Sequence, residues 1–303
     1  MTVIPNAFDG ERVDRVVSML CDLTRKEASE LVAAGGVRLG GRPVTLRSRR
    51  VTEGELLEID APAPAEAPGE LEADPGVEVP VVFADDHVVV VDKPAGLVVH
   101  PGAGRRSGTL VHGLLARYPD IAAVGDPARP GVVHRLDRGT SGLLMVARTP
   151  LAYGSLVSQL AARTVDRRYL ALAWGHFDNS AGVVDAPIGR GARDRTRMTV
   201  TAGGRSARTG YQVLESYDQP AEATLVECRL ETGRTHQVRV HLAAIGHPVV
   251  GDVRYGGARP YLAPGRPFLH AAELGFDHPA TGERVRFESP LPPDLENVRE
   301  TLH

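Results

Sequence analysis

The sequence contains few lysines, few cysteines and no long apolar run, and each shortage excludes a class of protein. Lys26 and Lys93 are the only lysines, so 33 of the 35 basic residues are arginines. Cys21 and Cys228 lie far apart and neither has the spacing of a metal site, so we expect reduced, packed thiols. No segment approaches the length of a membrane span, and the N-terminus lacks a basic region followed by an apolar one. We therefore expect a cytoplasmic protein that makes no contact with a membrane.

Motifs of several common enzyme classes are also missing. The chain has no Gly-x-x-x-x-Gly-Lys phosphate loop and no Gly-x-Ser-x-Gly nucleophile turn. His236 and His241 are five residues apart without a carboxylate partner, unlike the histidines of a zinc-binding His-Glu-x-x-His helix. The sequence therefore predicts no metal site.

Charge is distributed unevenly along the chain. The net charge is −3, but residues 61–80 hold five acids and no base, so the remainder carries +2. Residues 25–50 and residues 190–208 each carry a local charge of +5. Two basic patches on a nearly neutral body favour binding of a polyanion in a defined register, although a solvated charged face is the alternative for either patch taken alone.

The most informative segment is His-Arg-Leu-Asp-Arg-Gly-Thr-Ser-Gly-Leu-Leu at 134–144. Asp137 stands between two arginines in a polar, glycine-bearing turn, flanked by the apolar runs 131–133 and 143–146, which we predict to be buried strands or strand ends. A turn aspartate that caps its own backbone is the alternative on composition alone. A kinase catalytic loop is excluded because it requires His-Arg-Asp-Leu, Asp-Phe-Gly and a glycine-rich loop, none of which is present.

This segment resembles the signature of the RluA family of RNA pseudouridine synthases. The resemblance implies that Asp137 is the catalytic residue. The stretch Thr232–Leu242 is similar to the third motif of the family, which implies that Arg239 forms an ion pair with Asp137. If Thr235 caps a helix here, His236 and Arg239 lie on one face of it.

The resemblance assigns further residues. Tyr169 matches the family tyrosine that stacks on the target base, and Arg135 the residue that fills the space left by the flipped base. Lys93 belongs to a stretch similar to the first family motif, and we expect a structural role near the floor of the active site. His134 receives no role. We expect the arginines of the second basic patch to grip RNA phosphates, in particular Arg193, Arg195 and Arg197.

Residues 11–60 read as a small unit with two short helices and a glycine-turned hairpin. Thr24 begins the second predicted helix with Glu27 three residues on, a capping box. The unit resembles the RNA-binding domain of ribosomal protein S-four, which implies RNA contacts by Arg25, Lys26 and Arg38. A helical DNA-binding module or a protein-interaction module is the competing interpretation.

The domain expectation follows from these segments. We predict an S-four-like domain at 1–62, an extended acidic linker rich in Ala and Pro at 63–80, and a catalytic domain at 81–303. Strands that follow one another without regular intervening helices favour an α+β fold with a largely antiparallel sheet, which agrees with the pseudouridine synthase fold implied by the resemblance. Helices are expected at 109–117, 150–163 and 235–245.

The expected reaction is the isomerisation of specific uridines in RNA to pseudouridine, without cofactor or metal, by a chain that acts as a monomer. The N-terminal unit favours large-subunit ribosomal RNA as the substrate. The alternatives are the same reaction on transfer RNA, and a non-catalytic RNA-binding or ribosome-assembly factor on the same scaffold. A hydrolase that uses Asp137 is a more distant alternative, because the motif offers no partner base or metal.

Overall fold

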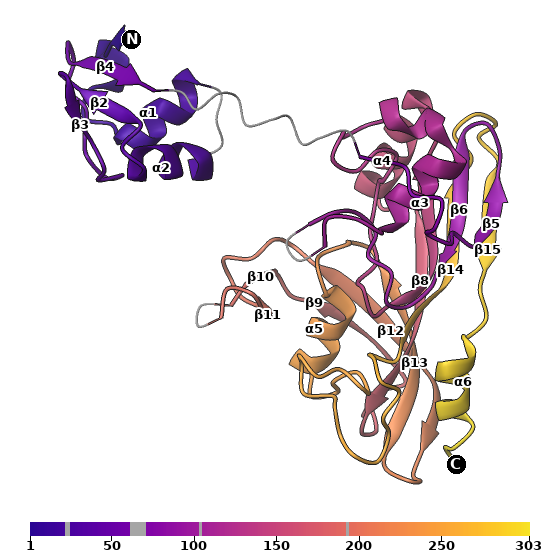
Figure 1. The fold of residues 1–303 in the computed structure, drawn as a ribbon. Coiled ribbons are helices and arrows are strands. Elements are labelled where there is room, and N and C mark those ends of the chain that lie inside the picture. Colours follow the sequence, from indigo (N-terminus) through magenta and orange to yellow (C-terminus); the bar gives the residue numbers. More distant parts are fainter. Residues whose placement is uncertain (22–24, 61–70, 103–104, 192–193) are drawn as a thin grey trace. The chain divides into compact units, whose positions relative to one another are not determined.

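The computed structural model describes residues 1–21, 25–60, 71–102, 105–191 and 194–303, without the side chains of residues 7 and 25–27. The chain divides into two compact units, Met1–Glu70 and Leu71–His303. Both are drawn in Figure 1, and each is described here by itself.

The N-terminal unit packs two helices against a small antiparallel sheet. Its valines recur at helical spacing in α1, so that Val13, Val16 and Val17 are fully buried. The sheet order is β1-β4-β2-β3. The elements are β1 (Thr2–Val3), the 3-10 helix η1 (Asn6–Phe8), α1 (Val13–Leu20), α2 (Arg25–Ala33), β2 (Val37–Leu39), β3 (Arg42–Pro43) and β4 (Leu56–Ile59). The two predicted helices and the hairpin are present, whereas the predicted cap at Thr24 lies outside the described residues.

The second unit is built on one nine-stranded mixed sheet, ordered β5-β6-β7-β14-β8-β13-β12-β9, with β15 paired to β14. All neighbouring strands are antiparallel except β7 and β14, which run parallel. The strands are β5 (Val81–Ala84), β6 (Val88–Lys93), β7 (Ser141–Ala147), β8 (Asp166–Trp174), β9 (Ala181–Asp185), β12 (Arg208–Tyr217), β13 (Ala223–Leu230), β14 (Leu269–Asp277) and β15 (Arg284–Glu288).

Helices and a hairpin complete this unit. They are α3 (Leu110–Arg117), the 3-10 helix η2 (Pro119–Ala123), α4 (Pro150–Ala162), the hairpin β10 (Ile188–Arg190) with β11 (Met198–Val200), α5 (Gln237–Ala244) and α6 (Pro293–Arg299). Successive side chains of β6 point to opposite faces of the sheet, and a different helix packs on each face. Val89 and Val91 belong to the core cluster that contains α3, and Val88 and Val90 to the cluster that contains α4. The α+β prediction is confirmed, including the predicted helix at 150–163, whose Thr149 hydroxyl caps Ala152 N–H at 3.1 Å.

Two expected elements differ from those in the structure. The run 131–133 is not a strand, because a left-handed Gly131 (φ 71°) turns the chain and leaves only a single bridge from Val132 to Val146. Helix α5 begins at Gln237 and not at a Thr235 cap; its N-cap is His236, in a left-handed conformation (φ 58°).

The extended linker was predicted to run to residue 80. In the structure, Leu71 and Val77 pack against the core of the second unit, and Val79 is buried within it. Asp74 N–H also donates to His112 C=O at 2.9 Å. The segment 71–80 therefore belongs to the second unit, because its few apolar residues bury themselves against α3.

Candidate active site

The loop that carries Asp137 leads into β7 and is held by contacts from distant parts of the chain. Gly96 N–H donates to Arg138 C=O at 2.7 Å, and Arg266 Nη1 donates to Gly139 C=O at 3.1 Å. Within the loop, Thr140 N–H donates to Asp137 C=O at 3.1 Å. The backbone of the turn is thus occupied, and the Asp137 side chain, 15% exposed, is left to other partners.

The partner of Asp137 is Arg239, as the motif predicts. Arg239 Nη1 donates to Asp137 Oδ2 at 3.0 Å from the first turn of α5. The same guanidinium binds Asp252 in a bidentate manner, with Nε to Oδ2 at 2.6 Å and Nη2 to Oδ1 at 2.9 Å. Burial opposes the charge on Arg239, but the hydrogen bonds and charges of Asp252 and Asp137 raise its pKa above the ordinary value. The cation beside Asp137 is therefore permanent and fixed in orientation.

His236 lies on the other side of the Asp137 carboxylate, with Nε2 3.9 Å from Oδ1. Its left-handed backbone, uncommon for a residue with a side chain, turns the ring toward the carboxylate and is the kind of strain found at functional sites. His236 Nδ1 and the Tyr255 hydroxyl are 2.9 Å apart. Burial lowers the pKa of His236, with the charge of Asp137 acting against it, so the ring is neutral at neutral pH.

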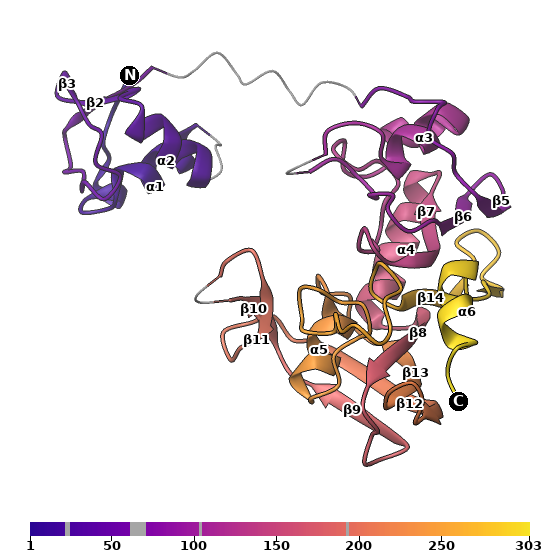
Figure 2. The same cartoon turned by 60° about the horizontal axis from the view of Figure 1, so that its bottom comes forward.

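Tyr255 connects this centre with the arginine-rich hairpin. Its hydroxyl accepts Met198 N–H at 3.3 Å from β11, and its ring lies under the guanidinium groups of Arg239 (5.1 Å) and Arg197 (5.0 Å). Tyr255 also packs with Ile188 and with Val240 of α5 in one apolar cluster. The β10–β11 hairpin therefore lies beside α5, as Figure 2 shows.

Tyr169 projects from β8 into a cavity of about 610 Å³ that Asp137, His134, Arg135 and His236 also line. Burial, to 7% exposed, raises the pKa of the Tyr169 hydroxyl to about 12, so the ring remains uncharged. A second hollow of about 510 Å³ shares Asp137 and His236 and adds Arg239. Asp137 thus stands where the two hollows meet, and Tyr169 forms part of the wall of the larger one.

Two further basic side chains, Lys93 and His134, belong to the surroundings of the Asp137 loop. Lys93 is fully buried and donates to Pro94 C=O at 2.8 Å and Leu97 C=O at 3.0 Å; burial lowers its pKa to about 8, against the charge of Asp137. His134 accepts Met145 N–H through Nε2 at 3.1 Å, and burial lowers its pKa to about 3. A protonated ring could not accept this bond, so His134 is neutral and ties the loop to β7.

The predicted RNA-contacting arginines are only partly placed. Arg195 is exposed and Arg197 reaches Tyr255, both between β10 and β11, whereas Arg193 lies outside the described residues. Arg38 is half-exposed on β2 and 3.6 Å from Asp60. The side chains of Arg25 and Lys26 are not among those described. Arg135 is exposed at the cavity mouth.

Sequence reasoning missed Asp252 and Tyr255. They come from the loop 251–268, outside the recognised motifs, and a lone acid after an apolar stretch gives no signal of its own. Among the described residues, no three His, Cys, Asp or Glu side chains are grouped so that they could hold a metal ion. In the same part of the chain, no helix has the length and apolar character needed to cross a membrane.

Comparison with known proteins agrees with this geometry. Residues 87–244 match the RNA pseudouridylate synthase family, and residues 11–57 match the S4 domain. The chain is 43% identical over 293 residues to the uncharacterized RNA pseudouridine synthase YlyB of Bacillus subtilis, covering 96% of this chain and 94% of that protein. It is 44% identical over 314 residues to ribosomal large subunit pseudouridine synthase D of Xanthomonas campestris, covering 99% and 91%.

A solved structure shows the same fold. Human RNA pseudouridylate synthase domain containing 1 matches with a TM-score of 0.58 and 31% identity, over 75% of this chain and 90% of that chain. The chain is therefore a member of the RluA family of RNA pseudouridine synthases, an isomerase that acts on RNA and carries an N-terminal S4 domain.

Proposed function

We propose that this enzyme converts specific uridines of large-subunit ribosomal RNA to pseudouridine, with Asp137 as the catalytic carboxylate and without a cofactor. The observation that carries the proposal is the chain of contacts Asp137–Arg239–Asp252, at 3.0 and 2.6 Å, at the edge of a cavity lined by Tyr169. A buried carboxylate is costly unless a cation and hydrogen bonds compensate it, and Arg239 is held in place for that purpose.

The reaction breaks the bond between ribose C1′ and uracil N1, turns the base and forms a bond from C1′ to C5. C5 releases its hydrogen as a proton and N1 takes up a proton. The product contains the atoms of the substrate, so no oxidant and no group donor enters the balance. Asp137 serves either as the nucleophile at C1′ or as the base that removes the C2′ proton on a glycal route. Both routes require a carboxylate held in a fixed orientation beside the sugar, and the ion pair with Arg239 supports that role for Asp137.

The surrounding residues handle the base. The target must leave its stack before C1′ can reach Asp137, and Tyr169 offers an uncharged aromatic face in the same cavity. Arg135, exposed two residues before Asp137, is placed to fill the space that the base leaves. His236 confines the carboxylate from the other side.

Ribosomal RNA as the substrate is supported by two findings. The S4 domain match adds an arginine-rich unit to the catalytic unit. The relatives from Xanthomonas campestris, Nitrosomonas europaea and Pseudomonas aeruginosa, 41–44% identical, are called ribosomal large subunit pseudouridine synthase D.

The test is tritium release from carbon-five-labelled uridine in large-subunit ribosomal RNA, with wild type beside Asp137→Asn and Asp137→Ala. We expect release by the wild type alone, while Asp137→Asn keeps its RNA affinity within about tenfold, since affinity rests on phosphate contacts. Release from transfer RNA only would replace the substrate assignment. Release by Asp137→Asn at the wild-type rate would remove Asp137 from its role.

A further inference from the structure

The larger cavity extends well beyond Asp137 and is strongly basic. Asp137 and Glu231 are its acidic lining residues, against six arginines: Arg129, Arg135, Arg163, Arg167, Arg205 and Arg234. Four of these arginines (Arg163, Arg167, Arg205 and Arg234) come from the end of α4, from β8 and from the loops beside them, and they are here called the arginine wall. Arg205 belongs to the second basic patch, whose arginines were expected to contact phosphate, whereas Arg163, Arg167 and Arg234 received no role from the sequence.

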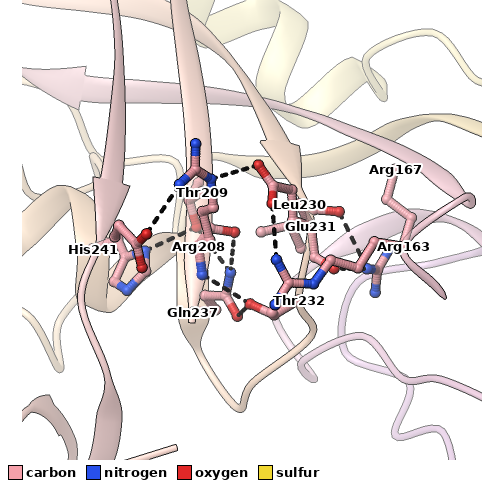
Figure 3. A network of polar contacts seen from close by, with 10 residues as sticks. Arg163, Arg167, Arg208, Thr209, Leu230, Glu231, Thr232, Gln237 and His241 are labelled. Carbon is pink, nitrogen blue, oxygen red and sulfur yellow. Dashed lines mark hydrogen bonds and ion pairs between the residues drawn. The ribbon is translucent and has the colours of Figure 1, made fainter. Parts of the chain in front are cut away.

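Arg167 is the unusual member of the arginine wall. It is 7% exposed, and no carboxylate in the described part of the chain pairs with it. Its Nη2 donates to Leu230 C=O and Glu231 C=O, both at 3.2 Å (Figure 3), whereas the buried Nε has no partner. Desolvation lowers the pKa of Arg167. A buried guanidinium that is bonded only to neutral carbonyls keeps an uncompensated charge.

The surroundings of Arg167 are preorganised. A Cβ on Gly233 would stand 2.9 Å from Arg167 Nη1, so the glycine makes room for that nitrogen. Gln237 Oε1 accepts Thr232 Oγ1–H at 2.7 Å and Arg234 N–H at 3.0 Å, which holds the loop of the arginine wall. Figure 3 shows the contact between Thr232 and Gln237.

Glu231, the acid that lies among the arginine wall, is already engaged by other residues. Glu231 accepts from Arg208 Nε at 2.7 Å and from Arg163 Nη1 at 3.1 Å. Burial, followed by the charges of Arg205 and Arg163, lowers the pKa of Arg234, so positive charges within the arginine wall repel one another. An anion that entered here would relieve both the repulsion and the unpaired charge of Arg167.

We propose that the arginine wall is a phosphate subsite, in which Arg167 binds one backbone phosphate of the RNA next to the nucleotide held at Tyr169. Arg167 and Tyr169 are two residues apart on β8, so their side chains share a face about 7 Å apart along the strand. A nucleotide against Tyr169 therefore places its own phosphate, or that of its neighbour, within reach. The planar fork of a guanidinium matches a phosphate oxygen pair. This inference rests on the proposed RNA function of the cavity.

The test measures the Kd of wild type and of Arg167→Met for a uridine-containing fragment of large-subunit ribosomal RNA. In a series of such fragments, one phosphate at a time is replaced by an uncharged methylphosphonate. At one position, we expect the neutral linkage to weaken wild-type binding by about tenfold and to leave Arg167→Met unchanged. The slope of log Kd against log salt should fall by about 0.7 in the variant. An equal cost of every methylphosphonate in both proteins would overturn the proposal.

Arg229→Met is the matched control. Arg229 pairs with Arg168 in the strand register, on the opposite face from Arg167 and Tyr169, and its side chain is 60% exposed. In Arg229→Met, each methylphosphonate should weaken binding as much as it does in the wild type. If Arg229→Met instead loses the effect at the same position as Arg167→Met, the effect is due to overall charge and the proposal is overturned. If Arg167→Met does not fold, Arg234→Met carries the test at the same phosphate.

Binding is measured here apart from turnover, so the two proposals fail separately. A wild type that releases no tritium contradicts the proposed function, whereas absent coupling at Arg167 contradicts only the subsite.

Discussion

At the scale of single residues, Arg239 divides its guanidinium between two carboxylates of different exposure. Asp252 is fully buried and also accepts the backbone N–H groups of Arg254 at 3.0 Å and Tyr255 at 3.2 Å. Asp137 accepts a hydrogen bond from the remaining nitrogen of the guanidinium, Nη1, and lines the cavity. Asp252 therefore acts as a positioning residue, which orients the cation that Asp137 needs.

Asp252→Asn should damage both stability and turnover. The amide presents an N–H₂ to an arginine that can only donate, so one buried contact becomes repulsive and the free energy of unfolding should fall by about 3 kcal/mol. We expect the single-turnover rate of tritium release to fall more than RNA affinity. The control is Asp277→Asn, which breaks an exposed pair with Arg284 and should cost at most about 1 kcal/mol. Equal losses in both variants would contradict the assignment.

Lys93 predicts a specific pH dependence of stability. Its folded pKa of about 8 lies below the ordinary 10.5, so the folded protein resists protonation and is penalised below pH 8. As the pH rises from 8 to 10.5, the unfolded chain keeps the proton that the folded protein has lost, and stability rises. Relative to Lys93→Met, the wild type should gain about 3 kcal/mol over this interval, measured by urea denaturation. Parallel curves for the two proteins would show that Lys93 titrates normally.

Sequence reasoning reached the residues of the site that lie in motifs. Asp137, Arg239 and Tyr169 were expected together, and each lines one of the two adjoining hollows. His236, which was expected only to share a helix face with Arg239, lines both. The catalytic and base-stacking roles given to them remain proposals. Asp252 and Arg167 were not foreseen, because a positioning acid and a buried arginine are defined by what they touch and not by their neighbours in sequence.

At the scale of elements, β7 connects the Asp137 loop to the centre of the sheet. Gly142 stands in it at φ 110°, between Lys93 of β6 and Ala271 of β14. A Cβ at this position would lie 2.3 Å from Ala271 C=O. The glycine permits the parallel pairing of β7 with β14, and through it sets where Asp137 stands.

Two glycine substitutions should therefore have opposite effects. Gly142→Ala meets both an unfavourable φ and a backbone clash, and should lower the free energy of unfolding by at least about 2 kcal/mol. Gly154→Ala lies on the exposed side of α4 with open space around the new Cβ, and should raise it by about 0.5–1 kcal/mol. Thermal and urea unfolding of both variants measure the contrast. Destabilisation by Gly154→Ala would contradict the helix as described.

Helices and strands with a clear hydrophobic periodicity or a capping residue were predicted from the sequence. Element boundaries that depend on contacts with distant residues were not. The run from Pro150 and the alternating β-branched segments carry their own periodicity and caps. The run 131–133 has the composition of a strand, but a turn at Gly131 limits its pairing to a single bridge. Helix α5 begins at Gln237, two residues later than expected. The left-handed backbone of His236 cannot continue a helix, and the Gln237 side chain accepts the N–H of Arg234 in the preceding loop.

At the scale of the whole molecule, the chain is two separate units with separate cores. The N-terminal core holds Val13, Val37 and Leu57, and it shares no member with the clusters of the second unit. Arg38, Arg42, Arg47, Arg49 and Arg50 belong to the N-terminal unit. Because the cores are separate, we expect the second unit to fold without the N-terminal unit, and we expect the N-terminal unit to contribute its own share of the RNA affinity.

Removal of residues 1–70 should leave a folded catalytic unit. We expect its melting temperature to stay within a few degrees of that of the full-length chain, while RNA binding weakens by about tenfold or more, because several phosphate contacts are lost. Calorimetry and RNA titration of 71–303 measure this. Unchanged affinity and site choice would remove the assigned role of the N-terminal unit, and a truncation at 80 should unfold more easily, because it removes the buried Val79.

The sequence by itself determined the family, the α+β class, the two units and the identity of the central pair, Asp137 and Arg239. Each of these is written in local pattern: motifs, hydrophobic periodicity and charge runs act over a few residues. Only the tertiary structure decided that Asp252 clamps Arg239 and that Tyr255 connects the site to the β10–β11 hairpin. It also decided that a buried Arg167 lines the cavity with its Nε unpartnered among the described residues. These depend on burial and on contacts between segments 13 to more than 50 residues apart, and the energy of a charge is set by what surrounds it in space.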